Sequence, residues 1–381
     1  INSNRFEAMK TNKIYLVILL MFLSGAYYSQ ACDSLLESNA ETVGPYNVAT
    51  LVESDGLRDG PDYNGSTIYY PTNATPPFVS IIIVPGYWSY ESSIQEWGPF
   101  LASHGIITMT IGTNSIFDYP DLRANALLDA KITLQEENVR ANSPLVGKIN
   151  TAIIAVGGWS MGGGGAQLAA MADPSLKAVI GLCPWLDDTQ ITSNSLNHSI
   201  PIAIISGEAD GTAPPVDHAN VHYSYTPSGT DKLLYEVTNG DHLVANYPAS
   251  GGGEVGKIVL SWLKYFLVED DCYCQLLQDT PSSSSNFMTN VTCPTTGIDN
   301  QSNAVDYILK VYPNPAKERI NLITDNSITD YQIFSVSGVN ILEGRTSEGK
   351  NSIEISNLSA GVYFLKIRNE EYSRSIRFIV E

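Results

Sequence analysis

The sequence predicts an α/β domain, with a mostly parallel central sheet flanked by helices, followed by a small all-β sandwich. Three observations lead to this prediction. Apolar runs of strand length alternate with helical stretches as far as Val268. One of these runs ends in a turn with a serine between two glycines, Gly158 and Gly162, and a helical stretch follows it. Beyond residue 302 only short strand patterns remain, and a chain of 381 residues is long enough for two folded units.

The first observation concerns the strands of the α/β domain. Runs of this kind, separated by helical stretches, are typical of buried strands in a parallel sheet, here of about eight strands. The expected strands are Val79–Val84, Thr151–Val156, Lys177–Cys183, Pro201–Ser206 and Lys232–Val237, and the expected final helix is Glu254–Val268.

The serine turn predicts the nucleophile elbow of an α/β-hydrolase fold. A serine hydroxyl is a weak nucleophile at neutral pH, so it must be exposed beside a base, with backbone N–H groups aimed at the developing oxyanion. Gly158 and Gly162 flank Ser160 because the tight turn brings neighbouring backbones too close for a Cβ. The next three glycines would each cost a helix about 1 kcal/mol relative to alanine, which indicates close helix packing or open access to the helix N-terminus. The alternative is a plain glycine-rich loop.

An elbow of this fold supplies its partners in the chain order serine, acid, histidine. Among the five histidines, only His242 lies just past a later strand, in a loop from which a base could reach over the sheet edge. The preceding expected strand ends near two carboxylates, Glu208 and Asp210. Asp210 lies further into the turn and is better placed to accept a hydrogen bond from Nδ1 of His242, so Glu208 is the reserve.

The other four histidines are not expected to take part in catalysis. His104 and His198 come too early in the chain to serve as the base. His218 and His222, four residues apart, could form one face of a metal site, but no third ligand of matching spacing is near. We therefore expect them on a helix surface and expect no metal. Asp241 is expected to be a solvated loop carboxylate.

The loop after the expected strand Val79–Val84 supplies the second oxyanion donor in this fold. Gly86 allows the backbone there to approach a reacting carbonyl. The backbone N–H groups of Tyr87 and Met161 would then form the oxyanion hole.

Four aromatic residues are candidates for binding the substrate. The Tyr87 ring could cover an acyl or aromatic group. Trp185 follows a strand at the edge where ligands bind in open α/β sheets, so we expect it to stack on the substrate. Trp88 and Trp159 are kept as candidates for the same role, although an aromatic residue in such a place is often part of the core.

Several segments together carry a resemblance to one family. They are Ile83–Tyr87, Ser92–Ile94, Trp97–Pro99, Leu101–Gly105, Thr113–Asn114, Gly158–Gly165, Asp210–Pro214, Asn239–Gly240, His242, Ala245 and Asn246. With these residues the stretch from about Tyr46 to Val268 resembles the bacterial cutinase-like polyester hydrolases, which include the poly(ethylene terephthalate) hydrolases. The resemblance implies hydrolysis of a polymeric or small-molecule ester through an acyl-enzyme, in a shallow groove open to solvent. It also implies Tyr87 and Trp185 as an aromatic clamp around the scissile ester, and no cofactor.

Two other functions stay open on the sequence. The same fold serves lipases and short-chain carboxylesterases. The alternative without enzymatic activity is a surface adhesion protein with a silent hydrolase domain, and the intact set of Ser160, Asp210 and His242 argues against it.

The first residues predict export. Lys10 and Lys13 precede the apolar run Ile14–Leu23 and a group of small residues. This is the pattern of a secretory signal peptide starting at Met9, and the run is too short to span a membrane. A lipoprotein anchor at Cys32 is a minor alternative, because the residues before it make a poor lipobox.

Five cysteines are too few for a disulfide scaffold. Cys183 lies on an apolar strand and is expected to be a buried free thiol. The other four, Cys32, Cys272, Cys274 and Cys293, allow three pairings. We favour a bond from Cys293 to Cys272 or Cys274, which would tie the last segment of the domain to its final helix.

The net charge of −19 belongs to the α/β domain. Residues 33–300 carry 9 Lys and Arg against 29 Asp and Glu, whereas residues 301–381 carry 9 against 10. Such a surface repels polyanions, which argues against nucleic acid and anionic membrane as partners. A neutral ester fits better, and solubility outside the cell explains most of the acidity. We expect a monomer.

The polar segment after Thr280 predicts a linker before a separate module. Pro281 and four serines open a stretch through Ser302 whose composition marks a linker. The strands expected beyond it indicate a sandwich of about seven strands. They are Ile308–Tyr312, Ile320–Ile323, Tyr331–Ser335, Ser352–Ile355, Gly361–Ile367 and Ser373–Val380. We place a leader at 1–31, the α/β-hydrolase catalytic domain at 32–298, the linker at 299–308 and the sandwich at 309–381.

Three segments of this module carry a second resemblance. They are Val311–Pro315, Tyr331–Gly338 and Gly361–Ile367. They resemble the type A carboxy-terminal sorting domain of the type IX secretion pathway of Bacteroidetes. The resemblance implies the type IX machinery as a partner and a secreted or cell-surface protein. A substrate-binding sandwich is the alternative, but no row of exposed aromatic residues suited to a polymer is evident.

Overall fold

The structure is a computed structural model that describes residues 43–293, 310–323, 330–335, 339–345, 350–368 and 373–380. The expected signal peptide, Cys32 and the expected linker 299–308 lie outside the described residues. The chain divides after Cys293 into two compact units, and each is described by itself. Within the ranges described, the chain has no helix that combines the length and the apolar character needed to cross a membrane.

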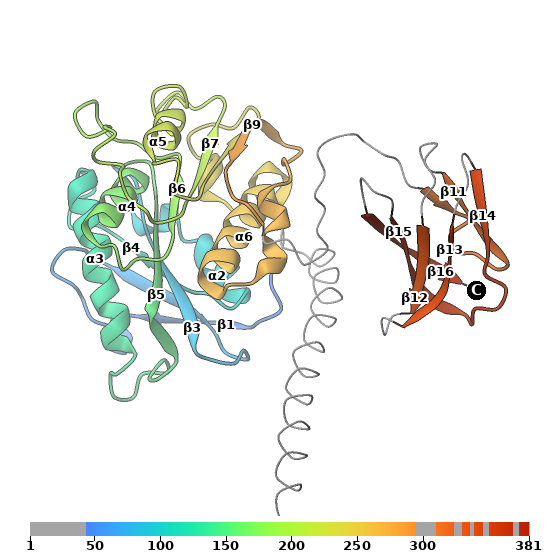
Figure 1. Cartoon of the computed structure of the whole chain (residues 1–381). Coiled ribbons are helices and arrows are strands. Elements are labelled where there is room, and N and C mark those ends of the chain that lie inside the picture. Colours follow the sequence, from blue (N-terminus) through green and yellow to red (C-terminus); the bar gives the residue numbers. More distant parts are fainter. Residues whose placement is uncertain are drawn as a thin grey trace, which may run out of the picture. The chain divides into compact units, whose positions relative to one another are not determined.

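The first unit is built on one nine-stranded sheet in the order β1-β2-β4-β3-β5-β6-β7-β8-β9 (Figure 1). Neighbours from β4 to β8 pair in parallel, while β1, β2 and β9 make the antiparallel pairs at the two edges. The predicted mostly parallel sheet is confirmed. The strands are β1 (Val48–Val52), β2 (Ser66–Pro71), β3 (Phe78–Val84), β4 (Ile107–Ile111), β5 (Ile149–Trp159), β6 (Val179–Leu182), β7 (Ile202–Gly207), β8 (Lys232–Val237) and β9 (Ser284–Thr289).

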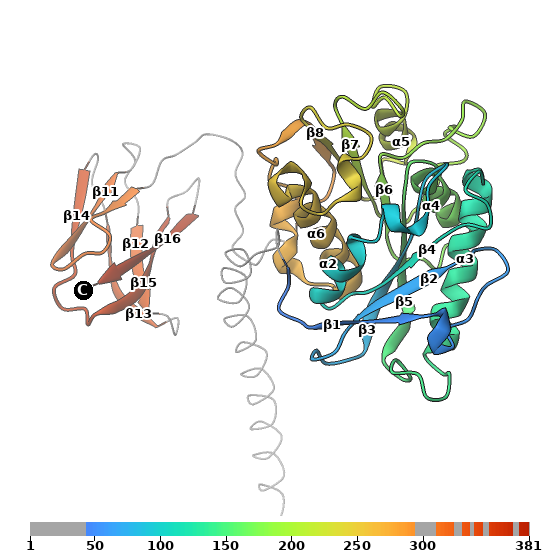
Figure 2. The same cartoon turned by 180° about the vertical axis from the view of Figure 1, so that it is seen from behind.

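Helices cover both faces of this sheet, α3 and α4 on one side and α2 and α6 on the other (Figures 1 and 2). The helix α3 begins at Pro120, whose fixed φ suits the first helical position. The helices are α2 (Trp97–Ser103), α3 (Pro120–Glu137), α4 (Met161–Ala172), α5 (Ala219–Tyr225) and α6 (Glu254–Val268). Single 3₁₀ turns are η1 (Glu53–Asp55), η2 (Glu91–Ser93), η3 (Val244–Asn246), η4 (Ser250–Gly253), η5 (Asp271–Tyr273) and η6 (Gln275–Leu277).

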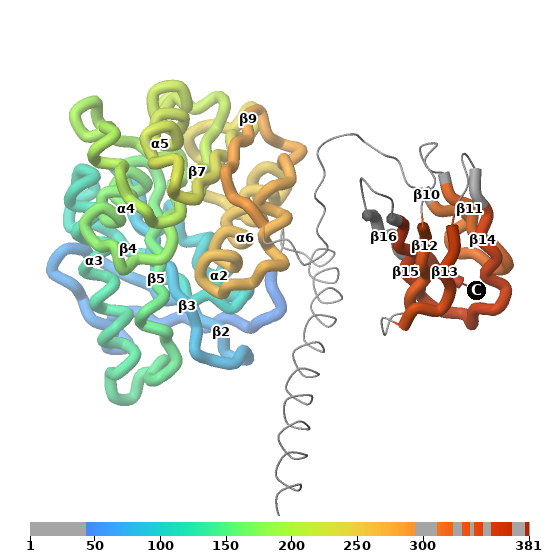
Figure 3. Tube along the Cα trace, viewed as in Figure 1, coloured from blue at the N-terminus to red at the C-terminus, as the bar shows by residue number. Residues whose placement is uncertain are grey.

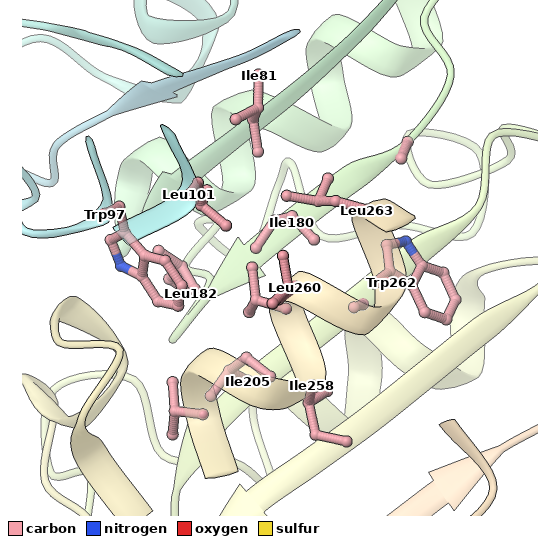
Figure 4. Packing of buried hydrophobic residues seen from close by; sticks show 14 of the residues in the cluster. Ile81, Trp97, Leu101, Ile180, Leu182, Ile205, Ile258, Leu260, Trp262 and Leu263 are labelled. Carbon is pink, nitrogen blue, oxygen red and sulfur yellow. The ribbon is translucent and has the colours of Figure 1, made fainter. Parts of the chain in front are cut away.

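The sheet and its helices pack together through two apolar cores. Along β3, Ile81 and Ile83 enter the core shared with α2 and α6, and Ile82 and Val84 enter the core shared with α3 and α4. Figure 4 shows the first of these cores, where residues of α6 face strand residues such as Ile180. Because both faces of the central strands are buried, the register of the sheet is strongly specified, and so is the position of the loops at its edge.

Residues 281–293 belong to the first unit, although the polar composition of the segment after Thr280 predicts a linker. This segment contains β9, whose place along the chain Figure 3 shows. The strand β9 pairs with β8 and extends the sheet. The backbone N–H groups of Ser282 and Ser283 donate to the carboxylate of Glu254 at 2.9 and 2.8 Å, so the serine run is fixed by a specific acceptor. Long-range pairing has overridden a composition typical of loops.

A disulfide closes the end of this unit. Of the two partners expected for Cys293, the structure selects Cys274, 19 residues earlier. Cys272 is disulfide-bonded as well. Cys183 is buried and free, as expected.

The second unit is a sandwich of two antiparallel sheets, β10-β11-β14 and β13-β12-β15-β16, as predicted. Ile320 and Leu322 from one sheet pack with Ile333 and Leu365 from the other in a single core. The strand β13 was not predicted, because it is a largely exposed edge strand interrupted by a glycine. The strands are β10 (Lys310–Tyr312), β11 (Arg319–Ile323), β12 (Asp330–Ser335), β13 (Asn340–Arg345), β14 (Lys350–Glu354), β15 (Gly361–Arg368) and β16 (Ser373–Val380).

Candidate active site

The predicted elbow lies between β5 and α4, with Ser160 at its apex. Its backbone has φ 57° and ψ −122°, a region that costs a residue with a side chain on the order of 1–3 kcal/mol. A Cβ on Gly158 would lie 2.3 Å from the carbonyl carbon of Gly162, and a Cβ on Gly162 would lie 2.4 Å from the carbonyl oxygen of Val84. Both glycines are therefore required by close backbone approach.

The following glycines bring α4 close to its neighbours. A Cβ on Gly164 would lie 2.1 Å from the carbonyl oxygen of Trp185, so the helix packs directly against the loop after β6. The close helix packing that the glycine run predicts is confirmed.

The elbow brings three side chains from distant parts of the sequence into one hydrogen-bonded row. The Nε2 atom of His242 lies 2.9 Å from Oγ of Ser160, and its Nδ1 atom lies 2.7 Å from Oδ2 of Asp210. With the proton on Nδ1 donated to the carboxylate, Nε2 is left free to accept from the serine hydroxyl. His242 and Asp210 come from the loops after β8 and β7, at the same sheet edge as the elbow.

Asp210 is held as a carboxylate although its side chain is 0% exposed. Burial alone would raise its pKa, but hydrogen bonds from His242 and from the backbone N–H groups of Ala213 and Thr212 lower the pKa below its ordinary value. Those two N–H groups lie 2.8 Å from Oδ1, opposite the oxygen that binds the imidazole. The carboxylate is thus oriented from both sides.

The loop that carries His242 is fixed by its own contacts. Nε1 of Trp159 donates to the carbonyl oxygen of His242 at 2.8 Å, and the two rings lie 5.1 Å apart. Glu208, the reserve acid, accepts from the backbone N–H of Asn239 at 2.8 Å and so supports the loop without touching the imidazole. Asp241 is exposed, as expected.

Among the described residues, the backbone N–H groups of Met161 and Tyr87 find no backbone acceptor, and both lie in segments next to the serine. Met161 is the first residue of α4, where the N–H has no intrahelical partner. The N–H of Trp88 donates to the carbonyl oxygen of Ile116 at 2.6 Å, whereas that of Tyr87 has no acceptor within the described ranges. A Cβ on Gly86 would lie 2.7 Å from the serine Cβ, so this loop packs against the elbow.

Arg123, which the sequence did not predict as a functional residue, holds this loop in place through hydrogen bonds to its backbone. Its side chain is fully buried, and its guanidinium donates to the carbonyl oxygens of Pro85, Asp118 and Ile116 at 2.8, 3.0 and 3.2 Å. Burial lowers its pKa to about 10, so it remains protonated at neutral pH. The available signal was one arginine among the apolar positions of α3.

The four aromatic candidates differ in exposure. Tyr87 is 43% exposed and Trp88 is 73% exposed, with a left-handed backbone at φ 54°. Trp185 is half-buried, and its ring lies 5.8 Å from that of His218. Trp159 is 7% exposed and held by the histidine loop, so little of its ring is open to a substrate.

The expected surface position of His222 is wrong. The side chain is fully buried and its Nδ1 atom shares a hydrogen bond with the amide of Gln167 on α4. Its burial lowers its pKa to about 3, so the ring is neutral. The short helix α5 packs on the sheet, and its inward face carries this histidine where an apolar residue is usual. His218 is half-buried at the start of the same helix.

Among the described residues, one cluster of three side chains has the spacing of metal ligands. It contains Cys183, Asp210 and His242, whose ligand atoms lie within 4.8 Å of one another. The Asp210 and His242 atoms are already hydrogen-bonded to each other, and burial raises the pKa of the Cys183 thiol well above its ordinary value. A cation bound here would break the hydrogen bond between Asp210 and His242, which orients the imidazole.

Comparison with known proteins covers both units. The sequence model of a family described as PET hydrolase-like matches residues 28–294, and that of the secretion system C-terminal sorting domain matches residues 310–381. A bis(hydroxyethyl) terephthalate hydrolase of Streptomyces coelicolor is 37% identical over 65% of this chain and 76% of its own length. Cutinase est1 of Thermobifida alba is 35% identical over 69% and 84%. Cutinase cut1 of Thermobifida fusca is 35% identical over 65% and 73%.

Proposed function

This chain belongs to the PET hydrolase-like family and is a carboxylic ester hydrolase with a secretion sorting domain, and from that premise we propose that it cleaves polyesters through Ser160, His242 and Asp210. The observation that carries the proposal is the double hydrogen bonding of His242, at 2.9 Å to the hydroxyl and 2.7 Å to the carboxylate. The sorting domain makes this a secreted or cell-surface protein that uses the type IX machinery.

The proposed reaction proceeds in two halves. Ser160 attacks the ester carbonyl while His242 takes its proton on Nε2, and Asp210 stabilises the resulting imidazolium. The backbone N–H groups of Tyr87 and Met161 donate to the tetrahedral oxyanion. His242 then protonates the departing alcohol, which leaves an acyl-enzyme. A water molecule, deprotonated by the same imidazole, releases the acid and restores the serine.

The proposed substrate class rests on the relatives and on the exposure of the site. The relatives named above are cutinases and a bis(hydroxyethyl) terephthalate hydrolase. Tyr87 and Trp88 are exposed on the loop whose Gly86 packs against the serine, so aromatic side chains next to the site are open to solvent. A short-chain esterase would not need this open aromatic rim.

The test is the Ser160→Ala variant of the full chain. We expect hydrolysis of a short-chain nitrophenyl ester and of polyester film to fall by about 10⁴-fold or more, because the remaining groups bind but do not form the acyl-enzyme. The wild type should also release acid from polyester film faster than from emulsified triglyceride. Retained turnover in the variant would reject the serine, and a preference for triglyceride would reject the polyester.

A further inference from the structure

We infer that Cys183 is a positioning residue for the proposed reaction, because its buried thiol fixes Asp210 beside His242 and joins the two loops that carry them. This inference rests on the proposed function and adds one side chain to the row that ends at Ser160. Cys183 follows β6 directly, so the three neighbouring parallel strands β6, β7 and β8 are each followed by one of these residues at the same sheet edge.

The backbone of Cys183 has an unusual conformation. Its φ is 43°, in the left-handed region that a residue with a side chain rarely adopts. Its N–H donates to the carbonyl oxygen of Ile205 on β7 at 2.7 Å, which ties this turn to the neighbouring strand. Strained residues persist only where the surrounding structure fixes them, and they cluster at active sites. The conformation of Cys183 therefore indicates a functional constraint.

The thiol lies where the acid meets the base. Its Sγ atom, a carboxylate oxygen of Asp210 and a ring nitrogen of His242 all lie within 4.8 Å of one another. Cys183 is 1% exposed and the side chain of Asp210 is 0% exposed, so solvent does not reach this contact. A buried carboxylate needs several donors. The N–H groups of Thr212 and Ala213 serve Oδ1 and the imidazole serves Oδ2, and the thiol is a further donor beside them.

The pKa of the Cys183 thiol reflects these surroundings. Burial raises the pKa well above its ordinary value, and the charge of Asp210 and a hydrogen bond to its carboxylate raise it further. Hydrogen bonds from the backbone N–H groups of Ala245 and Gly207 act in the opposite direction. The thiol therefore stays protonated at neutral pH. Its proton is donated to Asp210, while its sulfur accepts from the backbone.

These contacts connect the loop after β7 with the loop after β8. Ala245 lies three residues after His242, and its carbonyl oxygen accepts from Nε1 of the buried Trp97 at 3.1 Å, so its backbone is held in place. A Cβ on Gly207 would lie 2.4 Å from the carbonyl oxygen of Gly240, so the two loops are in direct contact. The sulfur binds both loops at this junction, next to the bond that orients the imidazole.

The alternative role for Cys183 is that of a small apolar residue in the core. The residue does belong to the core shared with α2 and α6. The two roles predict opposite effects of a hydroxyl at this position. An apolar site penalises serine more than alanine, because the hydroxyl is buried without a partner. A site that donates to Asp210 favours serine over alanine, because the hydroxyl keeps the hydrogen bond.

The experiment compares Cys183→Ala with Cys183→Ser in the full chain, and uses Ile180→Val as a control that removes a buried methyl group from β6. A hydrogen bond to a charged group contributes about ten-fold or more, and a thiol is a weak donor, so we expect kcat on a nitrophenyl ester to fall about 5- to 10-fold in the alanine variant. KM should stay within about two-fold, because the thiol is too deeply buried to touch the substrate.

The serine variant should recover kcat to within about two-fold of the wild type, and Ile180→Val should keep both constants. The rate at which a phosphonate labels Ser160 should follow kcat in all variants. A serine variant no more active than the alanine variant would overturn the inference. An equal loss in Ile180→Val would do the same, because it would show a general effect of core packing.

A spectroscopic measurement does not depend on the stability of the alanine variant. The Raman S–H stretching band of Cys183, assigned by its absence from Cys183→Ser, should rise in frequency in Asp210→Asn, because a neutral amide is the weaker acceptor. An unmoved band overturns the inference. If the wild type neither hydrolyses esters nor takes up the phosphonate, the proposed function fails, and this inference with it. If it does both and the Cys183 variants act as the wild type does, only this inference fails.

Discussion

At the scale of the residue, Asp210 determines which nitrogen of His242 faces the serine. The carboxylate accepts from Nδ1 at 2.7 Å and is itself oriented by two backbone N–H groups. An imidazole whose Nδ1 is protonated presents Nε2 as an acceptor, which is the form that a general base requires.

The Asp210→Asn variant should therefore keep the fold and lose activity. The amide can donate to the imidazole and stabilise the wrong tautomer, so we expect kcat on a soluble ester to fall by about 10⁴-fold. The carboxylate of Glu208 accepts a hydrogen bond from the backbone N–H of Asn239 and not from the imidazole. Glu208→Gln is therefore a matched control that should retain activity. Comparable losses in the two variants would contradict the assignment of the acid.

The hydrogen-bonded row of Ser160, His242 and Asp210 could be predicted from the sequence because chain order and turn chemistry locate its members before any contact is known. Neither Trp159 as the support of His242 nor Arg123 as the brace of the loop that carries Tyr87 could be predicted from the sequence. Each acts through a hydrogen bond to a carbonyl far away in the chain, 83 residues for Trp159. Backbone carbonyls occur at every residue, so no pattern of residue types points to these acceptors.

At the scale of the element, Arg123 joins helix α3 to two loops at the sheet edge. Arg123→Met should leave three carbonyl oxygens without their donor, which costs about 1–3 kcal/mol for each buried group left unsatisfied. We expect a lower melting temperature and a fall in kcat, because the loop that carries Tyr87 is loosened. Lys177→Met, at an exposed position, is the control. Equal activity in both variants would show that the loop holds its shape without the brace.

The disulfide between Cys274 and Cys293 crosslinks the last segment of the first unit. Removing it in the double variant Cys274→Ser, Cys293→Ser should lower the free energy of unfolding by about 3 kcal/mol, as expected for a loop of this length. Urea unfolding followed by tryptophan fluorescence measures this, since all five tryptophans lie in the first unit. An unchanged midpoint would indicate that β9 pairs equally well without the crosslink.

Elements with strong apolar patterns were predictable, and edge elements were not. The strand β8 and the helix α6 match their predicted bounds, Lys232–Val237 and Glu254–Val268. The edge strand β9 is polar and has the composition of a linker, because its pairing depends on the exposed edge of β8 and not on an apolar pattern of its own. The edge strand β13 also lacks an apolar pattern of its own, so the sequence does not predict it.

At the scale of the whole molecule, two buried histidines link stability to pH. Burial lowers the pKa of His198 to about 4 and of His222 to about 3, from an ordinary value near 6.5. The unfolded chain therefore binds protons first as the pH falls, and the folded state loses stability below about pH 6.5. The loss continues until both states are protonated, near the folded pKa values.

This is tested by urea unfolding at several pH values between 7.5 and 4.5. We expect the free energy of unfolding to fall with pH, with a steeper slope below about pH 6.5. The His222→Phe variant has one buried imidazole fewer. Its overall stability changes, and the slope of its unfolding free energy against pH should decrease by the equivalent of about one bound proton. A flat or rising profile in the wild type would contradict neutral buried imidazoles.

The bond between Cys274 and Cys293 also bears on the order of events during biogenesis. Thiols are oxidised outside the cytoplasm, so this crosslink forms only after the inner membrane has been crossed. A cargo that carries this crosslink before it meets the machinery that reads the sorting domain would have its α/β unit already stapled in the folded shape. Such a cargo would require a conduit through the outer membrane that is wide enough for a globule, because threading of a bare polypeptide would not suffice.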